Sequence, residues 1–413
     1  MTVHPREGRG GAPLSRRHVL QLGGLVAVAG TGILAGCSRS RPDPGANPVV
    51  LSRPDNPVRL PRHSEIAAIG DGLAPETGGV LKVFNYAEYL NPEVLAAFGE
   101  EYDVTVEVTT FVTQDEAVAK LRTPGINFDV YFPTVDIIGK VVAGKLLQPL
   151  NHSYLPNLSN AWPQLLDPFY DLGSQYTVPY VAFTTGVGYR TDVVSEIPAN
   201  GWELLWDTTH RGKVYLLEDP REGLSLAMLR DGRSTNLNTE DPEVIRAAGE
   251  TLASLVDAVN VKVGITAYQL LADGQASVHH CWSGDIVNAQ YYLPEDVGPE
   301  VLGYWFPEDR QGPVGTDTVA IPASAQKPVL AHLFLNYLLD NDVSMQNFGY
   351  TGYQPALSVA TPELLVADGY VPEHLANAVV TPEHYRDGLQ ELQLSADGEA
   401  LWLDEWAKFR AGN

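Results

Sequence analysis

From residue 79 onward, the apolar positions alternate between the spacing of strands and the spacing of helices. Residues 80–85 form a short, mostly apolar run that is typical of a buried strand. Residues 91–93, Asn-Pro-Glu, are a helix start with a capping Asn, a Pro in the first turn and an acid. Apolar side chains then recur at helical spacing up to Tyr102, and valines alternate over residues 104–108 as in a strand. This stretch therefore predicts strand, helix, strand.

The alternation continues further along the chain. Residues 113–116, Thr-x-x-Glu, form a capping box that opens a second helix, and a short apolar strand is expected at 128–132, before a helix at 137–142. This β-α-β-α-β order implies a parallel sheet with right-handed crossovers. Further strands are expected at 213–218, 277–282 and 314–321, and further helices at 224–229, 286–292, 328–339 and 399–409. Two α/β lobes fit this pattern.

Length and composition support a globular chain of more than one core. The chain has 413 residues, of which 44% are hydrophobic and 19% charged. Its formal charge of −24 argues against nucleic acid and against adsorption to anionic lipid, because both require an excess of Lys and Arg. The charge is compatible with a cationic ligand, although a soluble acidic surface explains it as well.

The N-terminus has the features of an export signal. Four arginines precede an apolar, Gly-rich run over residues 19–35, which is too short to predict a spanning helix. Residues 34–37, Leu-Ala-Gly-Cys, resemble the lipobox of bacterial lipoproteins, and residues 15–20 resemble a twin-arginine motif. We therefore expect a signal peptide over residues 1–36 and lipidation at Cys37; an uncleaved signal anchor is the alternative.

A proline-rich segment follows the predicted lipidation site. Seven prolines between residues 38 and 78 disfavour helix and central strand, so residues 37–78 are interpreted as a lipidated tether that lifts the domain off the membrane. If Cys37 is lipidated, Cys281 has no partner in the chain, and the fold relies on packing rather than on disulfides.

Aromatic and acidic residues gather where the predicted strands end. In open parallel sheets ligands bind beyond the carboxyl ends of the strands. The segments concerned are 85–89, 133–136, 219–222, 282–285 and the pair 316–317, which is placed before the strand that re-enters the first lobe. Ring faces attract ammonium groups and carboxylates accept their hydrogen bonds, so this set suits an organic cation.

Six segments resemble those of bacterial spermidine/putrescine-binding proteins. In chain order they are 84–89 (Phe-Asn-Tyr-Ala-Glu-Tyr), 128–134, 219–222 (Asp-Pro-Arg-Glu), 281–284 (Cys-Trp-Ser-Gly), 317–322 (Asp-Thr-Val-Ala-Ile-Pro) and 352–353. The resemblance implies a two-lobed periplasmic-binding-protein-like α/β fold of type II, each lobe a central sheet flanked by helices, with the ligand cleft between the lobes. Lobe 1 would comprise residues 79–185 and 316–357, and lobe 2 residues 186–315 and 358–413.

The resemblance also implies a function without catalysis, cofactor or metal. The chain would be a monomeric solute-binding lipoprotein on the outer face of the cytoplasmic membrane, which binds a polyamine and delivers it to the permease of an ABC importer. The ligand residues implied are Tyr86, Tyr89, Thr134, Asp219, Glu222, Trp282, Asp317 and Tyr353. Weaker candidates are Glu88, Asp136, Asp285 and, for a glutamine near the C-terminus, Gln393, with Gln390 as its alternative.

The chain departs from the family pattern at three of these places. Ala87 stands where the family has Thr, Asp136 where it has an aromatic residue, and Gly315 where it has Trp. Two aromatic side chains that would stack on the ligand are thereby lost and one carboxylate is gained. The sequence therefore leaves the chain length of the ligand undecided.

Each candidate also has a purely structural interpretation. Asp219 and Glu222 suit a helix cap and first turn, Trp282 a core, and Asp317 a turn, while a surface acid in a first turn is the simpler account of Asp136. A ferric-ion or other small-solute site using Tyr291, Tyr292 and His279 is the alternative function, although residues 279–281, His-His-Cys, alternate between the faces of a strand. No hydrolase, P-loop or zinc-protease motif is present.

Overall fold

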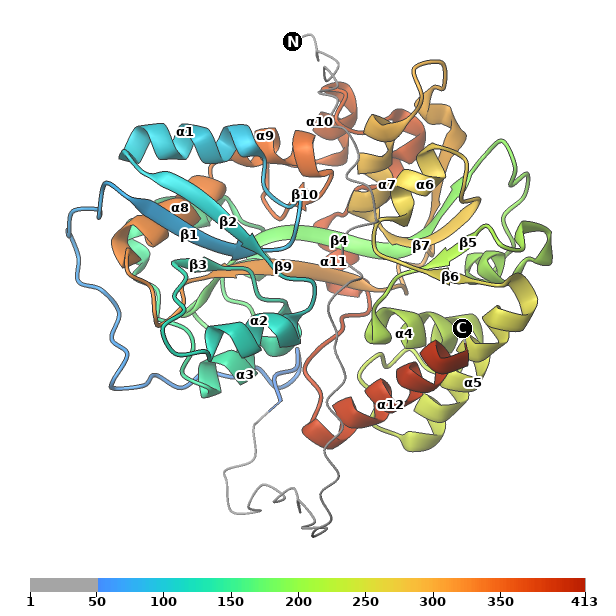
Figure 1. Ribbon diagram of the computed structural model, residues 1–413, viewed down its shortest axis with the longest axis horizontal. Coiled ribbons are helices and arrows are strands. Elements are labelled where there is room, and N and C mark those ends of the chain that lie inside the picture. The colour runs from blue at the N-terminus through green and yellow to red at the C-terminus, as the bar shows by residue number, and fades with distance from the viewer. Residues whose placement is uncertain (1–50, 413) are drawn as a thin grey trace, which may run out of the picture. The chain divides into compact units, whose positions relative to one another are not determined.

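Ten strands form one mixed sheet in the computed structural model, which describes residues 51–412 (Figure 1). The order of neighbouring strands is β2-β1-β3-β9-β4-β7-β5-β6, and β8 and β10 also pair with β4. The strands are β1 (Val80–Asn85), β2 (Thr105–Thr110), β3 (Val130–Tyr131), β4 (Thr177–Arg190), β5 (Val214–Leu216), β6 (Lys262–Val263), β7 (Val278–Trp282), β8 (Leu302–Trp305), β9 (Val314–Ala320) and β10 (Gln354–Pro355).

Helices lie on both faces of this sheet (Figure 1). They are α1 (Pro92–Tyr102), α2 (Gln114–Leu121), α3 (Ile138–Ala143), α4 (Pro220–Arg230), α5 (Pro242–Val259), α6 (Ala267–Ala272), α7 (Ser283–Ala289), α8 (Pro328–Leu338), α9 (Asn341–Thr351), α10 (Pro362–Ala367), α11 (Pro382–Asp387) and α12 (Ala396–Gly412). None of the helices between residues 51 and 412 is long and apolar enough to cross a membrane.

The predicted parallel units are confirmed at both ends of the sheet. β1 pairs in parallel with β2 and β3, and β5 pairs in parallel with β6 and β7. The predicted start of α1 is also confirmed, because the Asn91 side chain accepts a hydrogen bond from the Glu93 amide at 2.9 Å. The capping box of α2 is half formed: Thr113 accepts from the Glu116 amide, whereas the Glu116 carboxylate binds the amide of Val112.

The middle of the sheet corrects the expectation of purely parallel pairing. β4 was not predicted, yet it is the longest strand of the described chain and runs antiparallel to its neighbours. Its residues up to Thr184 pair with β9, and those from Thr185 pair with β7 and β8. Pro179 and the glycines at 186 and 188 interrupt the sequence pattern of a strand, which is why it went unrecognised.

Separate hydrophobic clusters fill the two halves of the sheet. Around β1, β3 and β9, one cluster includes α1 and α8 and another includes α2 and α3. Around β5 and β7, a third cluster includes α4, α5 and α12. α5 was also missed, although Asp241-Pro242-Glu243 repeats the start pattern of α1. The two-lobed α/β fold class is thereby confirmed, with β4 running from one half into the other.

The described part of the predicted tether packs against the domain. The Ser52 hydroxyl donates to the carbonyl of Phe169 at 2.7 Å, and the Tyr176 hydroxyl donates to the carbonyl of Pro61 at 2.6 Å. Further along, the Lys327 ammonium donates to the carbonyl of Glu76 at 2.9 Å. Residues 51–78 are therefore part of the folded body and do not lead away from it, which corrects that part of the expectation.

One ion pair joins a helix of the first half to a helix of the second. Lys140 on α3 donates to both carboxylate oxygens of Glu399 on α12 at 2.7 Å. The two side chains are 32% and 37% exposed, so this pair is well hydrated. The pair therefore links the two halves through residues far in sequence from β4, the strand that both halves share.

Gly186 tests the dependence of the fold on the shared strand. A Cβ at this position would lie 2.3 Å from the Trp305 carbonyl oxygen on β8, so β4 and β8 would have to separate. We expect Gly186→Ala to destabilise the protein by about 2 kcal/mol or more, and so to lower the melting temperature by several degrees in a thermal scan. Gly264→Ala is the matched control, because a Cβ there meets nothing within 4 Å; equal melting temperatures for the two variants would contradict the expectation.

Candidate functional site

Three tyrosine rings form a row beside the ends of β1 and α9. The ring centroids of Tyr86 and Tyr89 are 5.8 Å apart, and those of Tyr89 and Tyr353 are 5.0 Å apart. Gly352, with φ of +74°, ends α9 and sets the direction of Tyr353. The Tyr353 ring then lies so close to Gly284 that a Cβ there would be 2.6 Å from it. Gly284 therefore leaves the space that the Tyr353 ring occupies.

Asp317 lies next to this row. It sits inside β9, which confirms the strand predicted at 314–321 and corrects the placement of the pair 316–317 before that strand. Its side chain accepts a hydrogen bond from the Tyr89 hydroxyl at 2.6 Å. Burial raises the pKa of Asp317 to about 6, and the bond from Tyr89 partly opposes that rise. Because Asp317 pairs with Val181 of β4, the turn interpretation does not hold.

Asp285 is a second buried carboxyl beside the tyrosines. It lies in the first turn of α7, where its Oδ1 accepts a hydrogen bond from the Tyr353 hydroxyl at 2.8 Å. Its Oδ2 is buried and has no hydrogen-bond donor among the described residues. Burial raises the pKa of Asp285 to about 7. Asp285, one of the weaker candidates from the sequence, therefore lies in the same cluster as Tyr353.

The start of α4 carries two more carboxyls. Asp219 caps the helix, with its Oδ1 accepting from the amides of Arg221 at 2.8 Å and Glu222 at 3.0 Å, so its structural role is confirmed. Glu222 is only 7% exposed, and its Oε1 accepts from Trp282 Nε1 at 2.7 Å and from the Thr185 hydroxyl at 2.9 Å. Burial raises the pKa of both carboxyls.

Asp136 belongs electrostatically to the same group. The Thr134 hydroxyl donates to its Oδ1 at 2.5 Å, and Thr134 also forms a β-bridge with Asp317. Asp136 is half-buried, and its charge contributes to the raised pKa of Asp317 and of Asp219. It is a first-turn acid, as its simpler interpretation held, but one that faces the other carboxyls.

Phe183 fills the space beside Gly315, where the family pattern has a Trp and an aromatic wall was expected to be thinned. It pairs with Gly315 across β4 and β9, and a Cβ at Gly315 would lie 2.5 Å from the Phe183 ring. The same ring contacts Trp282, with centroids 6.3 Å apart. Phe183 was missed because only the pairing of two strands distant in sequence brings it over Gly315. The half-buried Trp282 thus lies between an aromatic ring and Glu222 rather than deep in a core.

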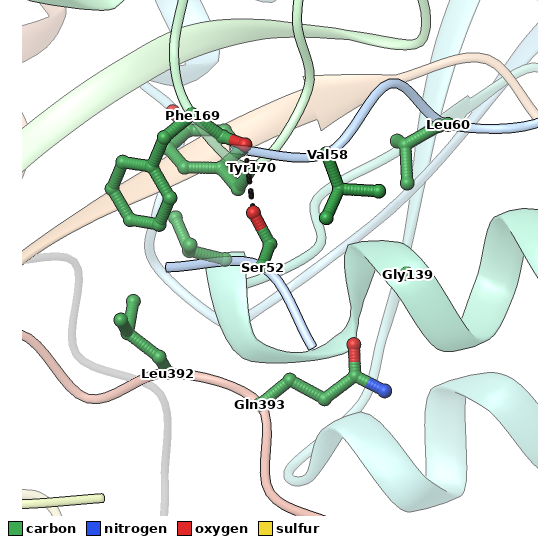
Figure 2. A pocket seen from close by; sticks show the side chains of 9 residues that line it. Ser52, Val58, Leu60, Gly139, Phe169, Tyr170, Leu392 and Gln393 are labelled. Atoms are coloured by element: carbon green, nitrogen blue, oxygen red, sulfur yellow. Dashed lines mark hydrogen bonds between the residues drawn. The ribbon is translucent and has the colours of Figure 1, made fainter. Parts of the chain in front are cut away.

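The remaining weak candidates lie in different surroundings. Glu88 is exposed. The Gln393 side chain is directed toward Gly139, and both residues line, together with Ser52, a pocket of about 20 Å³ that is too small for an organic ligand (Figure 2). Gln390 donates to the Tyr385 carbonyl. Between them Glu391, which sequence reasoning passed over, accepts from the Ser225 hydroxyl on α4 at 2.7 Å.

The residues of the ferric-ion alternative do not form a metal site. His279 is fully buried within β7, where burial lowers its pKa to about 3, and Tyr292 packs against Tyr268. Within residues 51–412 no three His, Cys, Asp or Glu side chains are grouped as a metal ion requires.

Two α/β halves that share strands, with buried carboxyls and aromatic rings gathered where they meet, define a two-lobed solute-binding protein. The chain belongs to the family of bacterial extracellular solute-binding proteins, whose model matches residues 93–370. This family binds solutes for transport and is not enzymatic, so the expectation of a protein without catalysis is confirmed by membership.

Proteins of known function and known structure align with most of this chain. It is 30% identical over 260 residues to the spermidine/putrescine-binding periplasmic protein 1 of Haemophilus influenzae, covering 62% of this chain and 69% of that one. It is 28% identical over 340 residues to the spermidine/putrescine-binding periplasmic protein of Escherichia coli, covering 82% and 93%. The structure of a putative spermidine/putrescine ABC transporter from Listeria monocytogenes matches with a TM-score of 0.70 at 25% identity, covering 81% and 99%.

The buried carboxyls make the empty protein sensitive to pH. A carboxyl whose pKa is higher in the folded chain than in the unfolded chain stays protonated to a higher pH in the folded state. Its contribution to stability is fully present below the unfolded pKa and is lost as the pH rises through the folded pKa. For Asp285, whose pKa is raised from 3.8 to about 7, this window runs from about pH 4 to about pH 7. Asp285→Asn keeps the bond from Tyr353 and removes the titration.

We therefore expect Asp285→Asn to gain stability relative to the wild type between pH 5 and pH 8, by about 3 kcal/mol. Urea unfolding of both proteins at the two pH values, without ligand, measures the change. A difference in stability that does not vary with pH would show that Asp285 titrates normally.

Proposed function

We propose that this protein binds a polyamine of the putrescine or spermidine type. The observation that carries the proposal is the set of buried carboxyls that lack a cationic partner beside aromatic rings. Asp317 with Tyr89, Asp285 with Tyr353 and Glu222 with Trp282 lie on three different elements of the sheet and its helices. The spermidine/putrescine-binding proteins among its relatives support the same ligand class.

A chain of amines separated by methylenes complements such a site. Burial makes ionised carboxylates costly, and an ammonium group that enters the site offsets this cost by charge-assisted hydrogen bonds. The tyrosine, tryptophan and phenylalanine rings suit both the ammonium groups and the methylenes between them. Micromolar binding requires about 8 kcal/mol, which a few such bonds and contacts supply.

The individual roles are proposed on the same basis. The side chains proposed to contact the ligand are Tyr86, Tyr89, Thr134, Asp136, Phe183, Asp219, Glu222, Trp282, Asp285, Asp317 and Tyr353. Asp219 has one oxygen engaged as the cap of α4 and would use the other. Gln393 and Glu88 are left out because of their surroundings.

Calorimetry with putrescine and spermidine tests the ligand. Asp317→Asn should weaken binding of the preferred amine by about 10- to 100-fold, because a charged hydrogen-bond partner contributes about 1.5–3 kcal/mol. Asp296→Asn, at an exposed position, is the matched control and should bind as the wild type does. Failure of the wild type to bind either amine while binding another solute would refute the ligand assignment; equal affinities for both variants would refute the role of Asp317.

We further propose that ligand capture closes two lobes, 79–185 with 316–357 and 186–315 with 358–413. The change of pairing between Thr184 and Thr185 of β4 supports the first boundary, and the pairing of β9 with β3 and β4 supports the return of the chain to lobe 1. The closed form would be recognised by the permease of an ABC importer, with this protein acting as a monomer.

The proposed membrane anchor lies outside the described residues. We propose that residues 1–36 direct export through the twin-arginine route and that Cys37 is lipidated, which holds the protein at the outer face of the cytoplasmic membrane. The support is the sequence motif, together with the extracellular character of the family. Two acyl chains are enough for stable anchoring, whereas one is marginal.

Fractionation of cells that express the protein tests the anchor. Cys37→Ala should move the protein from the membrane to the soluble fraction and leave amine affinity unchanged, since the residues proposed to bind the ligand lie within the described body. Cys281→Ala serves as the matched cysteine control and should stay with the membrane. Membrane association of the Cys37→Ala protein would exclude lipidation as the anchor.

A further inference from the structure

The carboxyls near the start of α4 include one that the sequence did not single out. Glu391 lies between α11 and α12, and its Oε1 accepts a hydrogen bond from the Ser225 hydroxyl at 2.7 Å. Ser225 lies three residues beyond Glu222 on α4, so the two side chains share one face of the helix. Glu391 is therefore held on the same face of α4 as Glu222.

Glu222 carries an oxygen without a donor on this face. Its Oε1 is occupied by Trp282 and Thr185, whereas its Oε2 is buried and has no hydrogen-bond partner among the described residues. Buried carboxylate oxygens in folded proteins are nearly always hydrogen-bonded. An acceptor of this kind beside a second carboxyl indicates a place for a hydrogen-bond donor that carries positive charge.

The cation nearest to the pair is engaged elsewhere. The Arg221 guanidinium donates to the carbonyls of Leu392 at 3.1 Å and Leu237 at 2.8 Å, and it stacks on the Trp402 ring with 4.6 Å to the centroid. A third bond goes to Asn238. Its terminal N–H groups thus bind backbone and amide oxygens, whereas its Nε has no hydrogen-bond partner among the described residues. Its charge opposes the raised pKa of Glu391 without a salt bridge to either carboxyl in the described structure.

The charges around the pair favour retention of a proton. Burial raises the pKa of Glu391 to about 7; Asp219 and Asp136 add to the rise, while Arg221 and Ser225 oppose it. Burial also raises the pKa of Glu222, with the charges of Glu391 and Asp219 adding to the rise. Burial raises the pKa of the Tyr304 phenol, and the charge of Glu222 adds to that rise, so this group adds no charge. Both shifts favour a state in which the pair retains a proton near neutral pH.

We propose that Glu391 and Glu222 together form an ammonium-binding subsite, where a primary amine of the ligand replaces the proton that the empty pair holds. The ligand ammonium enters with one positive charge, both carboxylates become ionised, and one proton leaves to solvent, so charge is balanced. This inference rests on the proposed polyamine-binding function and extends it with a residue and a linkage to pH. Ligand affinity should rise with pH from about 5 to about 8.

The test compares spermidine and putrescine binding to the wild type and to Glu391→Gln. The substituted amide would still accept the bond from Ser225 but would neither ionise nor hold a proton. At pH 8 we expect the variant to bind spermidine about 10-fold or more weakly, whereas at pH 5.5 the two proteins should differ by less than about 3-fold, because Glu391 is then protonated in the wild type. Calorimetry in two buffers of different ionisation enthalpy, at pH 6, should show about one proton fewer released by the variant.

Two further variants make the outcome decisive. Glu383→Gln removes an exposed carboxylate of the same C-terminal region and should behave as the wild type at both pH values. Glu391→Asp keeps the charge and should retain the pH dependence. The inference is overturned if Glu391→Gln changes affinity by the same factor at both pH values or leaves proton release unaltered while the wild type binds. The absence of amine binding by the wild type itself would overturn the proposed function as well.

Discussion

The continuity of β4 is the constraint on which the rest of the structure depends. One strand supplies pairing partners to both halves, with β9 along its first part and β7 and β8 along its second. Asp317 and Gly315 on β9, and Trp282 at the end of β7, are therefore fixed in register to residues of the same strand. Side chains separated by about a hundred residues or more in sequence are thereby placed opposite one another by strand pairing.

That placement brings together carboxyls which a stable core would avoid. Asp317, Asp285 and Glu222 are each less than a tenth exposed, and none has a salt bridge in the described structure. Such burial costs free energy that the hydrophobic clusters on both sides must offset. The cost is useful in a binding protein, because a cationic ligand relieves it only when it occupies the site, so specificity arises from what the empty site lacks.

Local sequence signals predicted the elements well, and long-range pairing limited the rest. The starts of α1 and α4 were visible because capping bonds lie within four residues, as Asn91 and Asp219 show. β4 was hidden because burial on both faces removes the alternation of a strand, and Pro179 and Gly186 resemble loop residues. Among site residues, Phe183 depends on its pairing with Gly315, and Glu391 lies in a segment without periodicity. Neither carries a signal that a single sequence displays.

The ion pair between Lys140 on α3 and Glu399 on α12 has a consequence for the opening of the two halves. A motion of the two halves that moves α3 away from α12 would break this contact and expose both groups fully. Since the side chains are about a third exposed, the pair contributes at most about 1 kcal/mol, which changes the ratio of shut to open molecules by no more than about fivefold. Such a contact is weak enough to break and re-form readily, and dissolved salt weakens it further. The ratio of closed to open molecules would therefore follow the ionic strength outside the cell.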